Sequence, residues 1–186
     1  MSYLRKIQYK IVPGQSFRVI HSCSGCGCKM HYQNTGRFRV NANGNKIDIW
    51  LIYQCEKCKH TLNLPIYERK AVKQISQKAY QMFLNNDEAL AQTYGRMVSF
   101  FKKNRMEVDY EGMTYDFLNE QGTKADFQEA DWIVIENPYG IPIRPERAAA
   151  EILQISRSQV KKMLDREELI VHSGNGKLEI QVVGAM

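Results

Sequence analysis

Cys23-Ser24-Gly25-Cys26 and Cys55-Glu56-Lys57-Cys58 are the two stretches that decide how the first third of this chain folds. In each of them two residues separate the cysteines, a spacing that lets both sulfur atoms reach one ion. The 28 residues between the pairs contain the strand-like runs Arg37–Asn41 and Lys46–Gln54, joined by Ala42-Asn43-Gly44-Asn45. Asn-Gly favours the positive φ of a hairpin turn. The sequence therefore predicts two metal-binding loops at the base of a small antiparallel sheet.

Zinc is the ion that this cysteine set predicts. Zinc accepts four thiolates in a tetrahedron at about 2.3 Å, and Cys23, Cys26, Cys55 and Cys58 would fill all four positions. Such a closed site leaves no place for a water molecule, so we expect a structural role and no hydrolytic chemistry. A module of this size is marginal on burial alone, and structural zinc contributes on the order of 10–16 kcal/mol. The arrangement resembles a zinc ribbon.

Other assignments of the cysteine region remain open at this point. Cys28 could replace Cys26 as a ligand because Cys26-Gly27-Cys28 is compact, or it could be a bystander thiol. Three histidines near the pairs could also substitute, namely His21, His31 and His60. A Cys-x-x-Cys pair can cycle between dithiol and disulfide, but that role is typical of a helix start beside a strand-helix-strand unit. Strand and turn patterns flank both pairs here, which favours metal.

Positive charge is concentrated in the same region as the cysteines. Residues 1–70 contain 12 Lys and Arg against 3 Asp and Glu, whereas residues 71–143 contain 7 against 11 and residues 144–186 contain 7 against 6. Localised positive charge favours anionic partners such as nucleic acid.

Two arginines of the first predicted strand stand beside aromatic residues. Arg37 and Arg39 alternate with Phe38 and Val40, so they share one strand face. The same module contains Tyr32, Trp50 and Tyr53. Arginines among aromatic side chains can hold phosphates while bases stack. The alternative is that the aromatic residues fill a thin core and the arginines only solvate it. The second strand has apolar residues on both faces, so either both faces are covered or Trp50 is a contact residue.

The chain is expected to be cytoplasmic. Its first ten residues lack the apolar run of a signal peptide, and no stretch is long and apolar enough to span a bilayer. Five cysteines clustered in a chain that is not secreted favour metal binding over a disulfide framework.

The remainder of the chain predicts helices followed by a hairpin. Asn86-Asp87 precedes a helix-spaced apolar stripe that extends to Phe101. Pro145 fits the first turn of a later helix, and Ser156 with Gln159 predicts a capping box for the next one. The fold class is therefore α+β. We expect a zinc-ribbon domain over residues 1–66, a mainly helical middle region over residues 67–143, and a helix-turn-helix with a short hairpin over residues 144–186.

The last of these regions resembles the small RNA-binding domain first described in the fourth protein of the small ribosomal subunit. Ala148, Ile152 and Leu153 match its first helix, and Ile155-Ser156-Arg157-Ser158-Gln159 matches the start of its second. In that family this helix start and its basic residues contact structured RNA. One departure is Glu167-Glu168, where the family commonly has a glycine. The alternative is a tail domain that only packs on the middle region, since fold does not fix function. The resemblance implies the following RNA-binding residues: Arg144, Ser156, Arg157, Ser158, Lys161, Lys162 and Arg166.

The whole chain resembles a bacterial family of about this length, described as a domain of unknown function, number ten-sixty-two. The resemblance rests on the two cysteine pairs, Thr35–Gly44, Asp48–Tyr53 and Ser156-Arg157-Ser158. It implies a bacterial cytoplasmic protein with a zinc ribbon and the tail domain, and it implies no particular activity.

No catalytic motif is present in the sequence. It contains no Gly-x-Ser-x-Gly elbow, no phosphate-binding glycine loop and no His-Glu-x-x-His. We therefore expect a non-enzymatic protein. The cysteine pairs, the basic region and the resemblance of the tail predict that it contains zinc and binds RNA or associates with the ribosome. The alternatives are a protein–protein adaptor and a DNA-binding regulator that acts through the zinc ribbon.

Overall fold

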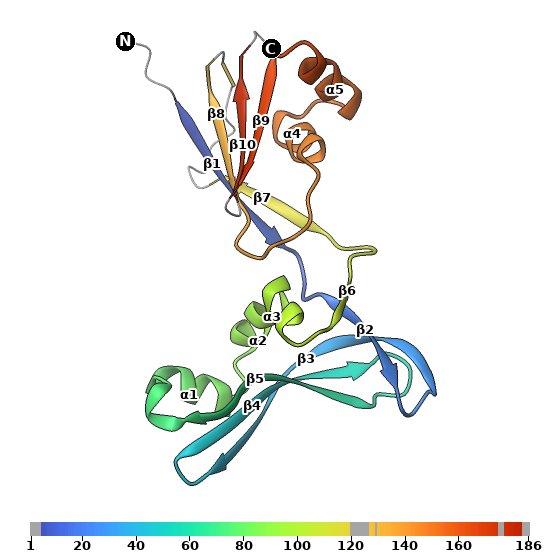
Figure 1. The fold of residues 1–186 in the computed structure, drawn as a ribbon, viewed down its shortest axis with the longest axis vertical. Helices are drawn as coiled ribbons and strands as arrows, with labels where there is room; N and C mark the ends of the chain where they lie inside the picture. The colour runs from blue at the N-terminus through green and yellow to red at the C-terminus, as the bar shows by residue number, and fades with distance from the viewer. Residues whose placement is uncertain (1–4, 120–126, 129, 175–176, 184–186) are drawn as a thin grey trace. The chain divides into compact units, whose positions relative to one another are not determined.

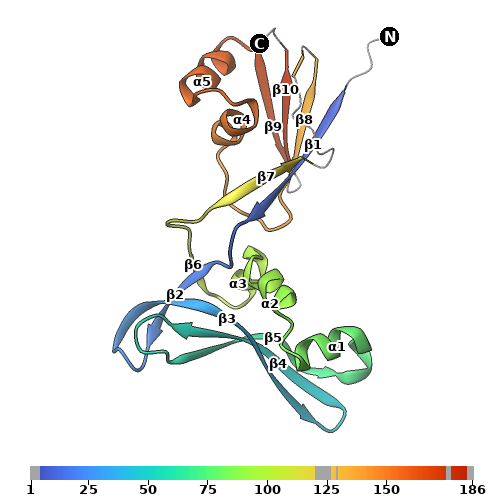
Figure 2. The ribbon, with the colours of Figure 1, turned by 180° about the vertical axis from the view of Figure 1, so that it is seen from behind.

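The computed structural model describes residues 5–119, 127–128, 130–174 and 177–183 (Figure 1). The chain divides into two compact units. Unit 1 consists of residues 1–12 and 115–186, and unit 2 of residues 13–114. Each unit contains a five-stranded sheet and helices (Figures 1 and 2), so the fold is α+β, as the sequence predicts. None of the described helices is both long and apolar enough to cross a membrane.

The sheet of unit 2 is antiparallel throughout and contains both cysteine pairs. Its strand order is β5-β4-β3-β2-β6. The strands are β2 (Arg18–Cys23), β3 (Cys28–Asn43), β4 (Lys46–Cys55), β5 (Thr61–Ala71) and β6 (Glu107–Asp109). The predicted hairpin is confirmed as β3–β4, and Gly44 at its turn has φ 59°. Because β3 reaches back to Cys28, the first cysteine pair lies in the β2–β3 turn and the second lies in the β4–β5 turn.

One face of this sheet forms the core of unit 2. Along β4 the side chains that are fully buried alternate with side chains that are only half buried. The buried set comprises Ile47, Ile49, Leu51, Tyr53 and Cys55. Trp50 and Ile52, which point the other way, are half buried. This is the period of two that a strand with one covered face requires.

Three helices cover the buried face, and a short 3₁₀ turn at Val72–Gln74 precedes them. They are α1 (Gln77–Leu84), α2 (Glu88–Gly95) and α3 (Val98–Lys103). Phe38 of β3 contacts Phe83 of α1 with ring centroids 4.9 Å apart. Tyr53 of β4 contacts Phe101 of α3 at 5.9 Å. Edge-to-face packing of large rings therefore joins the helices to the sheet.

The single helix predicted from Asn86-Asp87 to Phe101 is in fact two helices. The predicted cap is present, because the Asp87 side chain accepts a hydrogen bond from the Leu90 amide at 2.8 Å. The helix ends at Gly95, whose carbonyl accepts the Phe17 amide at 2.7 Å. A Cβ on Gly95 would lie 2.2 Å from Ser16 Oγ. The close approach of the segment before β2 thus ends α2, and α3 starts after a break.

The sheet of unit 1 combines the start of the chain with its end. Its order is β7-β1-β8-β10-β9. The strands are β1 (Lys6–Pro13), β7 (Tyr115–Asn119), β8 (Trp132–Glu136), β9 (Leu169–Gly174) and β10 (Lys177–Val182). β1 runs parallel to β8, while β10 is antiparallel to both β8 and β9.

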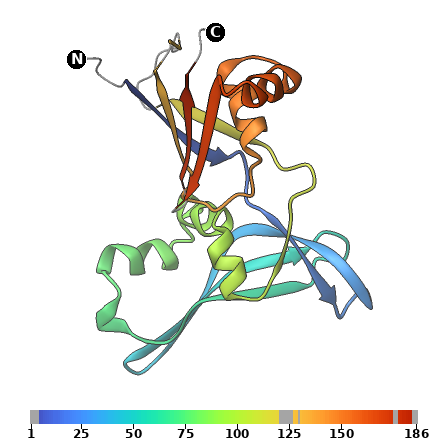
Figure 3. The same cartoon turned by 45° about the horizontal axis from the view of Figure 1, so that its top comes forward.

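Two helices pack beside this sheet. They are α4 (Pro145–Leu153) and α5 (Arg157–Asp165), and Figure 3 shows them next to β9. Pro145 occupies the first turn of α4, and the predicted capping box of Ser156 and Gln159 is present at the start of α5. Ile152 and Val160 are buried, as are the inner side chains of β8 and β10, so the helices and the sheet share one core.

The two units differ from the three predicted segments. The boundary expected after residue 66 falls inside unit 2, because α1, α2 and α3 cover the sheet that carries the cysteines. The boundary expected after residue 143 falls inside unit 1, because β10 pairs with β8. Contacts between strands that are far apart in sequence therefore set the division.

Candidate functional site

The two cysteine-bearing turns have the same backbone geometry. In the first turn the Cys23 carbonyl accepts hydrogen bonds from the amides of Cys26 and Gly27, at 3.2 and 2.8 Å. In the second turn the Cys55 carbonyl accepts the Lys59 amide at 3.0 Å. Gly27 and Lys59, each directly after the second cysteine of its pair, have φ values of 71° and 62°. Both turns therefore present two sulfur atoms toward a common point.

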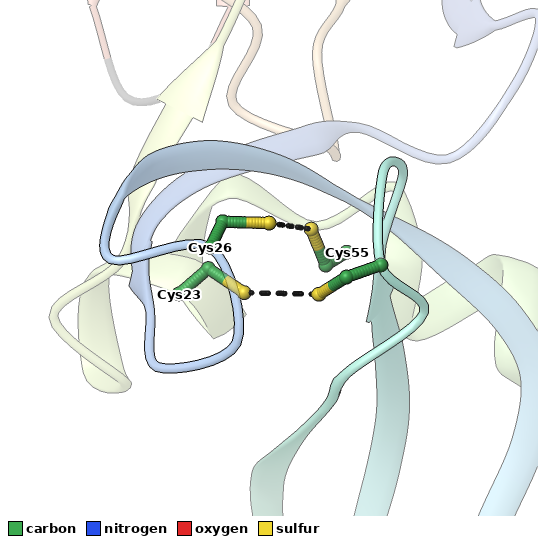
Figure 4. Close-up of side chains that lie close together, drawn as sticks. Cys23, Cys26 and Cys55 are labelled. Atoms are coloured by element: carbon green, nitrogen blue, oxygen red, sulfur yellow. Dashed lines mark hydrogen bonds between the residues drawn. The ribbon is translucent and has the colours of Figure 1, made fainter.

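The four sulfur atoms form one cluster. Among the described residues, Cys23, Cys26, Cys55 and Cys58 have their Sγ atoms within 4.8 Å of one another. The Sγ atoms of Cys23 and Cys58 are 3.3 Å apart, and those of Cys26 and Cys55 are 3.9 Å apart (Figure 4). All four are free thiols, not disulfides. Cys23 and Cys55 are buried, while Cys58 is exposed at the rim.

This cluster has the size and donor set of a metal site. Bonds of about 2.3 Å in a tetrahedron place the sulfur atoms about 3.8 Å apart, close to the separations above. A Cβ on Gly25 would lie 3.1 Å from the sulfur of Cys58 and 3.9 Å from that of Cys23. Glycine at this position therefore leaves the space beside the sulfurs open. The predicted four-cysteine set is thus brought together, in an arrangement compatible with a bound metal ion.

The four cysteines do not share one pKa: hydrogen bonds to other groups lower the pKa of a thiol, and contact with a neighbouring cysteine sulfur can raise it. The hydrogen bond with the Tyr32 side chain lowers the pKa of Cys23 to about 6 because it stabilises the thiolate. Contact with the sulfur of Cys58 raises the pKa of Cys26 to about 12. For Cys58 the hydrogen bond with the His60 backbone lowers the pKa, but contact with Cys23 and burial outweigh it, so its pKa is raised. A bound cation would remove this conflict, because it stabilises every thiolate at once.

Zinc binding at about pH 7.5 is expected to release two or more protons. The raised pKa values of Cys26 and Cys58 keep both thiols neutral until the metal displaces their protons. Cys23, with a pKa of about 6, is already ionised at this pH. With two protons coupled, affinity falls by about a hundredfold for each unit by which the pH is lowered. Calorimetric titration in two buffers of different ionisation enthalpy measures the proton count, and a count of zero would contradict this prediction.

The other proposed ligands lie outside the cluster. Cys28 is exposed, and its sulfur is 3.6 Å from Met30 Sδ. His60 Nε2 is 3.0 Å from Ser24 Oγ, a contact that joins the two turns. His31 Nε2 is 3.5 Å from Asp109 Oδ2. The sulfur cluster found among the described residues includes none of them.

The basic residues predicted in the first strand lie together on unit 2. Arg37 and Arg39 are both exposed on β3. In the strand register Arg37 is opposite Ile52 and Arg39 is opposite Trp50. The expectation that both arginines share one strand face is confirmed, and Trp50 lies on that face, whereas Tyr32 and Tyr53 are buried on the other.

In unit 1 some of the basic residues line one cavity. It has a volume of about 1030 Å³, and its cationic lining residues are Arg144, Arg147, Arg157 and Lys161. Tyr115 also lines it, and the guanidinium of Arg147 lies 4.6 Å from the centre of that ring. Two acidic residues, Glu146 and Asp165, complete its charged lining.

The remaining predicted residues lie near this cavity but outside its lining. Ser156 Oγ accepts the Gln159 amide as a helix cap and is 2.9 Å from Ser158 Oγ. Lys162 is on α5, and Arg166 is its C-cap, 3.8 Å from a Glu168 carboxylate oxygen. These residues belong to α5 or its caps, and none of them lines the cavity.

Two residues were missed by the sequence reasoning. Tyr32 hydrogen-bonds to Cys23 from β3 and is 1% exposed. Arg147 lines the cavity together with Arg144. The signal for Arg147 was its position in the first turn of a predicted helix, three residues after Arg144, which directly precedes that helix. Nothing in the local sequence pairs Tyr32 with Cys23.

Comparison with known proteins gives a family and no closer relative. No curated protein and no solved structure matches the chain. A family model described as "Protein of unknown function (DUF1062)" matches residues 40–175. The match includes the second cysteine pair, Trp50, α4 and α5, and it begins after the first cysteine pair. It covers well over half of the 186 residues, so the chain belongs to the family described as Protein of unknown function (DUF1062).

Proposed function

We propose that this chain is a non-enzymatic, zinc-containing, cytoplasmic protein that binds structured RNA, alone or in a ribonucleoprotein such as the ribosome. In this proposal the zinc ion stabilises unit 2, and the cavity of unit 1 contacts the RNA.

Zinc is favoured by the donor set. Four thiolates in a tetrahedron suit zinc or an iron–sulfur centre, and a closed site of this kind is usually structural. The cysteine-bearing turns lie at one end of β2, β3, β4 and β5, with the β3–β4 hairpin between the two pairs. This is the layout on which the zinc-ribbon interpretation rests. Elemental analysis of the purified protein would distinguish one zinc per chain from iron.

The cavity of unit 1 is the observation that carries the RNA proposal. Arg144, Arg157 and Lys161 were inferred as RNA contacts from the resemblance, and all three line this single cavity with Arg147. Arg147 is already paired with Glu151 at 2.8 Å, so Arg144, Arg157 and Lys161 are the side chains best placed to hold phosphates, whose contacts dominate nucleic-acid affinity. The succession of α4, α5, β9 and β10 also follows the order of the resembled RNA-binding domain.

The charge of unit 1 as a whole sets a limit on this binding. Unit 1 has 11 Lys and Arg against 12 Asp and Glu. Electrostatic attraction must therefore come from the local cavity and not from the net charge, so affinity should fall steeply with salt.

The test is binding of a structured RNA hairpin to the full chain at about 50 and 200 mM salt. Arg157→Glu combined with Lys161→Glu should weaken binding at least about tenfold and reduce the salt slope by about 2. Lys78→Glu combined with Lys102→Glu makes the same charge change on exposed helix positions of unit 2 and serves as the control. Binding that is absent at low salt, or equally affected by both double variants, would refute the proposal.

Two other outcomes would favour the alternatives. A preference for duplex DNA over RNA would indicate a DNA-binding regulator. A partner protein that is retained after nuclease treatment, and lost in the unit 1 double variant, would indicate a protein–protein adaptor.

A further inference from the structure

The face of the unit 2 sheet that points away from its helices carries two arginines beside a tryptophan. Across β3, β4 and β5 the register places Arg39 next to Trp50 and Trp50 next to Pro65. The adjacent row places Arg37 next to Ile52. Neighbouring strands are about 4.8 Å apart, so each arginine is one strand away from an apolar side chain. The face thus combines a cationic edge with an apolar centre.

The packing of unit 2 does not use this face. Phe38 and Tyr53 point to the opposite side of β3 and β4, where they contact α1 and α3. Trp50 and Ile52 are left half buried, and the two arginines are exposed. A half-buried tryptophan combines a large apolar surface with a polar N–H, the combination that is enriched at interfaces.

The arginines are available to an anion. Among the ion pairs of the described residues, none includes Arg37 or Arg39. Asp48, two residues from Trp50 on the same face, already accepts the Arg69 amide at 2.7 Å. Unit 2 contains 15 Lys and Arg against 8 Asp and Glu, a net charge of +7. The local charge and the charge of the unit therefore both favour a polyanion.

We propose that this face binds an unpaired segment of RNA, with Arg37 and Arg39 on neighbouring phosphates and a base stacked on Trp50. The proposal rests on the proposed function in taking RNA as the partner, but it uses a different surface. Residues two apart on a strand are about 6.6 Å apart. An RNA backbone can therefore follow β3 from one arginine to the other, while its bases lie over β4 and β5.

Unpaired RNA fits this surface better than a duplex does. In a duplex the bases are stacked on each other and present only their edges, so an indole ring has no base face to contact. An unpaired base offers its face, and stacking on an aromatic side chain requires no particular sequence. Pro65, opposite Trp50 on β5, and Ile52, two residues along β4, extend the apolar surface around Trp50. The proposed selectivity is thus for single strands, with little preference among bases.

The first experiment reads binding at Trp50 itself. The chain has two tryptophans, so a Trp132→Phe variant leaves Trp50 as the only indole. Titration of the full chain with a twelve-nucleotide oligouridine should quench its fluorescence in a saturable, salt-dependent way. A self-complementary RNA duplex of the same length should quench it at least about tenfold more weakly. No quenching by the single strand, or equal quenching by the duplex, would overturn the proposal.

The second experiment assigns the contacts. Trp50→Ala should weaken oligouridine binding about 5- to 150-fold, the range for loss of one stacked base. Trp50→Phe should retain most of the affinity, and it keeps the test decisive if the alanine variant fails to fold. Arg37→Ala with Arg39→Ala should reduce the salt slope by about 1.4, because each phosphate contact on a single strand contributes about 0.7. Lys78→Ala with Lys102→Ala removes two charges from α1 and α3, on the opposite side of the sheet, and should change the salt slope far less. Equal slopes in the two double variants would refute the arginine contacts.

The two RNA proposals can fail separately. Arg157→Glu with Lys161→Glu should leave Trp50 quenching by oligouridine unchanged, while weakening binding of the structured hairpin. Loss of oligouridine quenching in that variant would overturn the proposal that the sheet face binds RNA separately from the cavity. Loss of hairpin binding only, with quenching retained, supports it. A DNA oligonucleotide of the same length tests whether the protein distinguishes deoxyribose from ribose. Clearly tighter binding of DNA would overturn RNA as the partner.

Discussion

With zinc at the four-cysteine cluster as proposed, Cys55→Ser is expected to abolish metal binding and to lower the melting temperature of unit 2 by more than about 10 °C. Loss of a structural metal is among the few single changes that cost several kcal/mol, and a hydroxyl is a far poorer zinc ligand than a thiolate. Cys55 is 0% exposed, so the polar replacement would also be buried. About 3–5 kcal/mol corresponds to such a shift in a unit of about 100 residues.

The matched control for this variant is Cys28→Ser. Cys28 is exposed and lies outside the sulfur cluster, so this variant should keep one zinc per chain and a melting temperature close to that of the unchanged protein. Metal content is measured by elemental analysis and stability by differential scanning calorimetry. A full complement of zinc in Cys55→Ser, or loss of zinc in Cys28→Ser, would contradict the ligand set.

Phe101→Ala is expected to destabilise unit 2 by about 3–5 kcal/mol, because deletion of a buried ring loses its transfer energy and leaves a cavity. Phe101 is 0% exposed and contacts three other rings. Its ring centroid is 6.1 Å from Phe17, 5.9 Å from Tyr53 and 5.4 Å from Phe100. This one side chain therefore joins α3 to β4 and to the segment that enters β2.

Urea unfolding followed by circular dichroism would measure this loss. Phe101→Leu should cost less than Phe101→Ala, since it refills part of the space. Leu84→Ala is the control, because Leu84 is 45% exposed on α1 and its loss should cost under about 1 kcal/mol. Equal free energies of unfolding for Phe101→Ala and Leu84→Ala would show that the helices do not depend on this contact.

The parts of the fold that were predictable depend on interactions between residues that are close together in the sequence. The Asn-Gly turn, the strand at Lys46–Gln54, and the capping box of Ser156 and Gln159 all appear in the structure. Each depends on backbone conformations and hydrogen bonds between near neighbours. The two Cys-x-x-Cys turns belong to the same class, and for this reason the sulfur cluster could be inferred before the fold was known.

The parts that were not predictable depend on pairing over long distances. Nothing around Lys6–Pro13 indicates that this strand lies parallel to Trp132–Glu136, more than a hundred residues later. The helix break at Gly95 likewise involves a distant residue, because the Phe17 amide donates a hydrogen bond to the Gly95 carbonyl. Local periodicity carries no information about such partners, and the three-segment division therefore differs from the two units of the structure.

The cysteine cluster separates what the sequence determined from what the tertiary structure decided. The sequence alone indicated that Cys23, Cys26, Cys55 and Cys58 could share one ion, because the spacing within each pair sets the reach of its two side chains, and it left Cys28 and the nearby histidines as alternatives. Only the tertiary structure decided what surrounds them: β3 brings Tyr32 to Cys23, and helices on one face of the sheet leave Arg37, Arg39 and Trp50 on the other. The physical reason is that ligand spacing is a property of a short loop, whereas burial and exposure depend on which distant elements pack together.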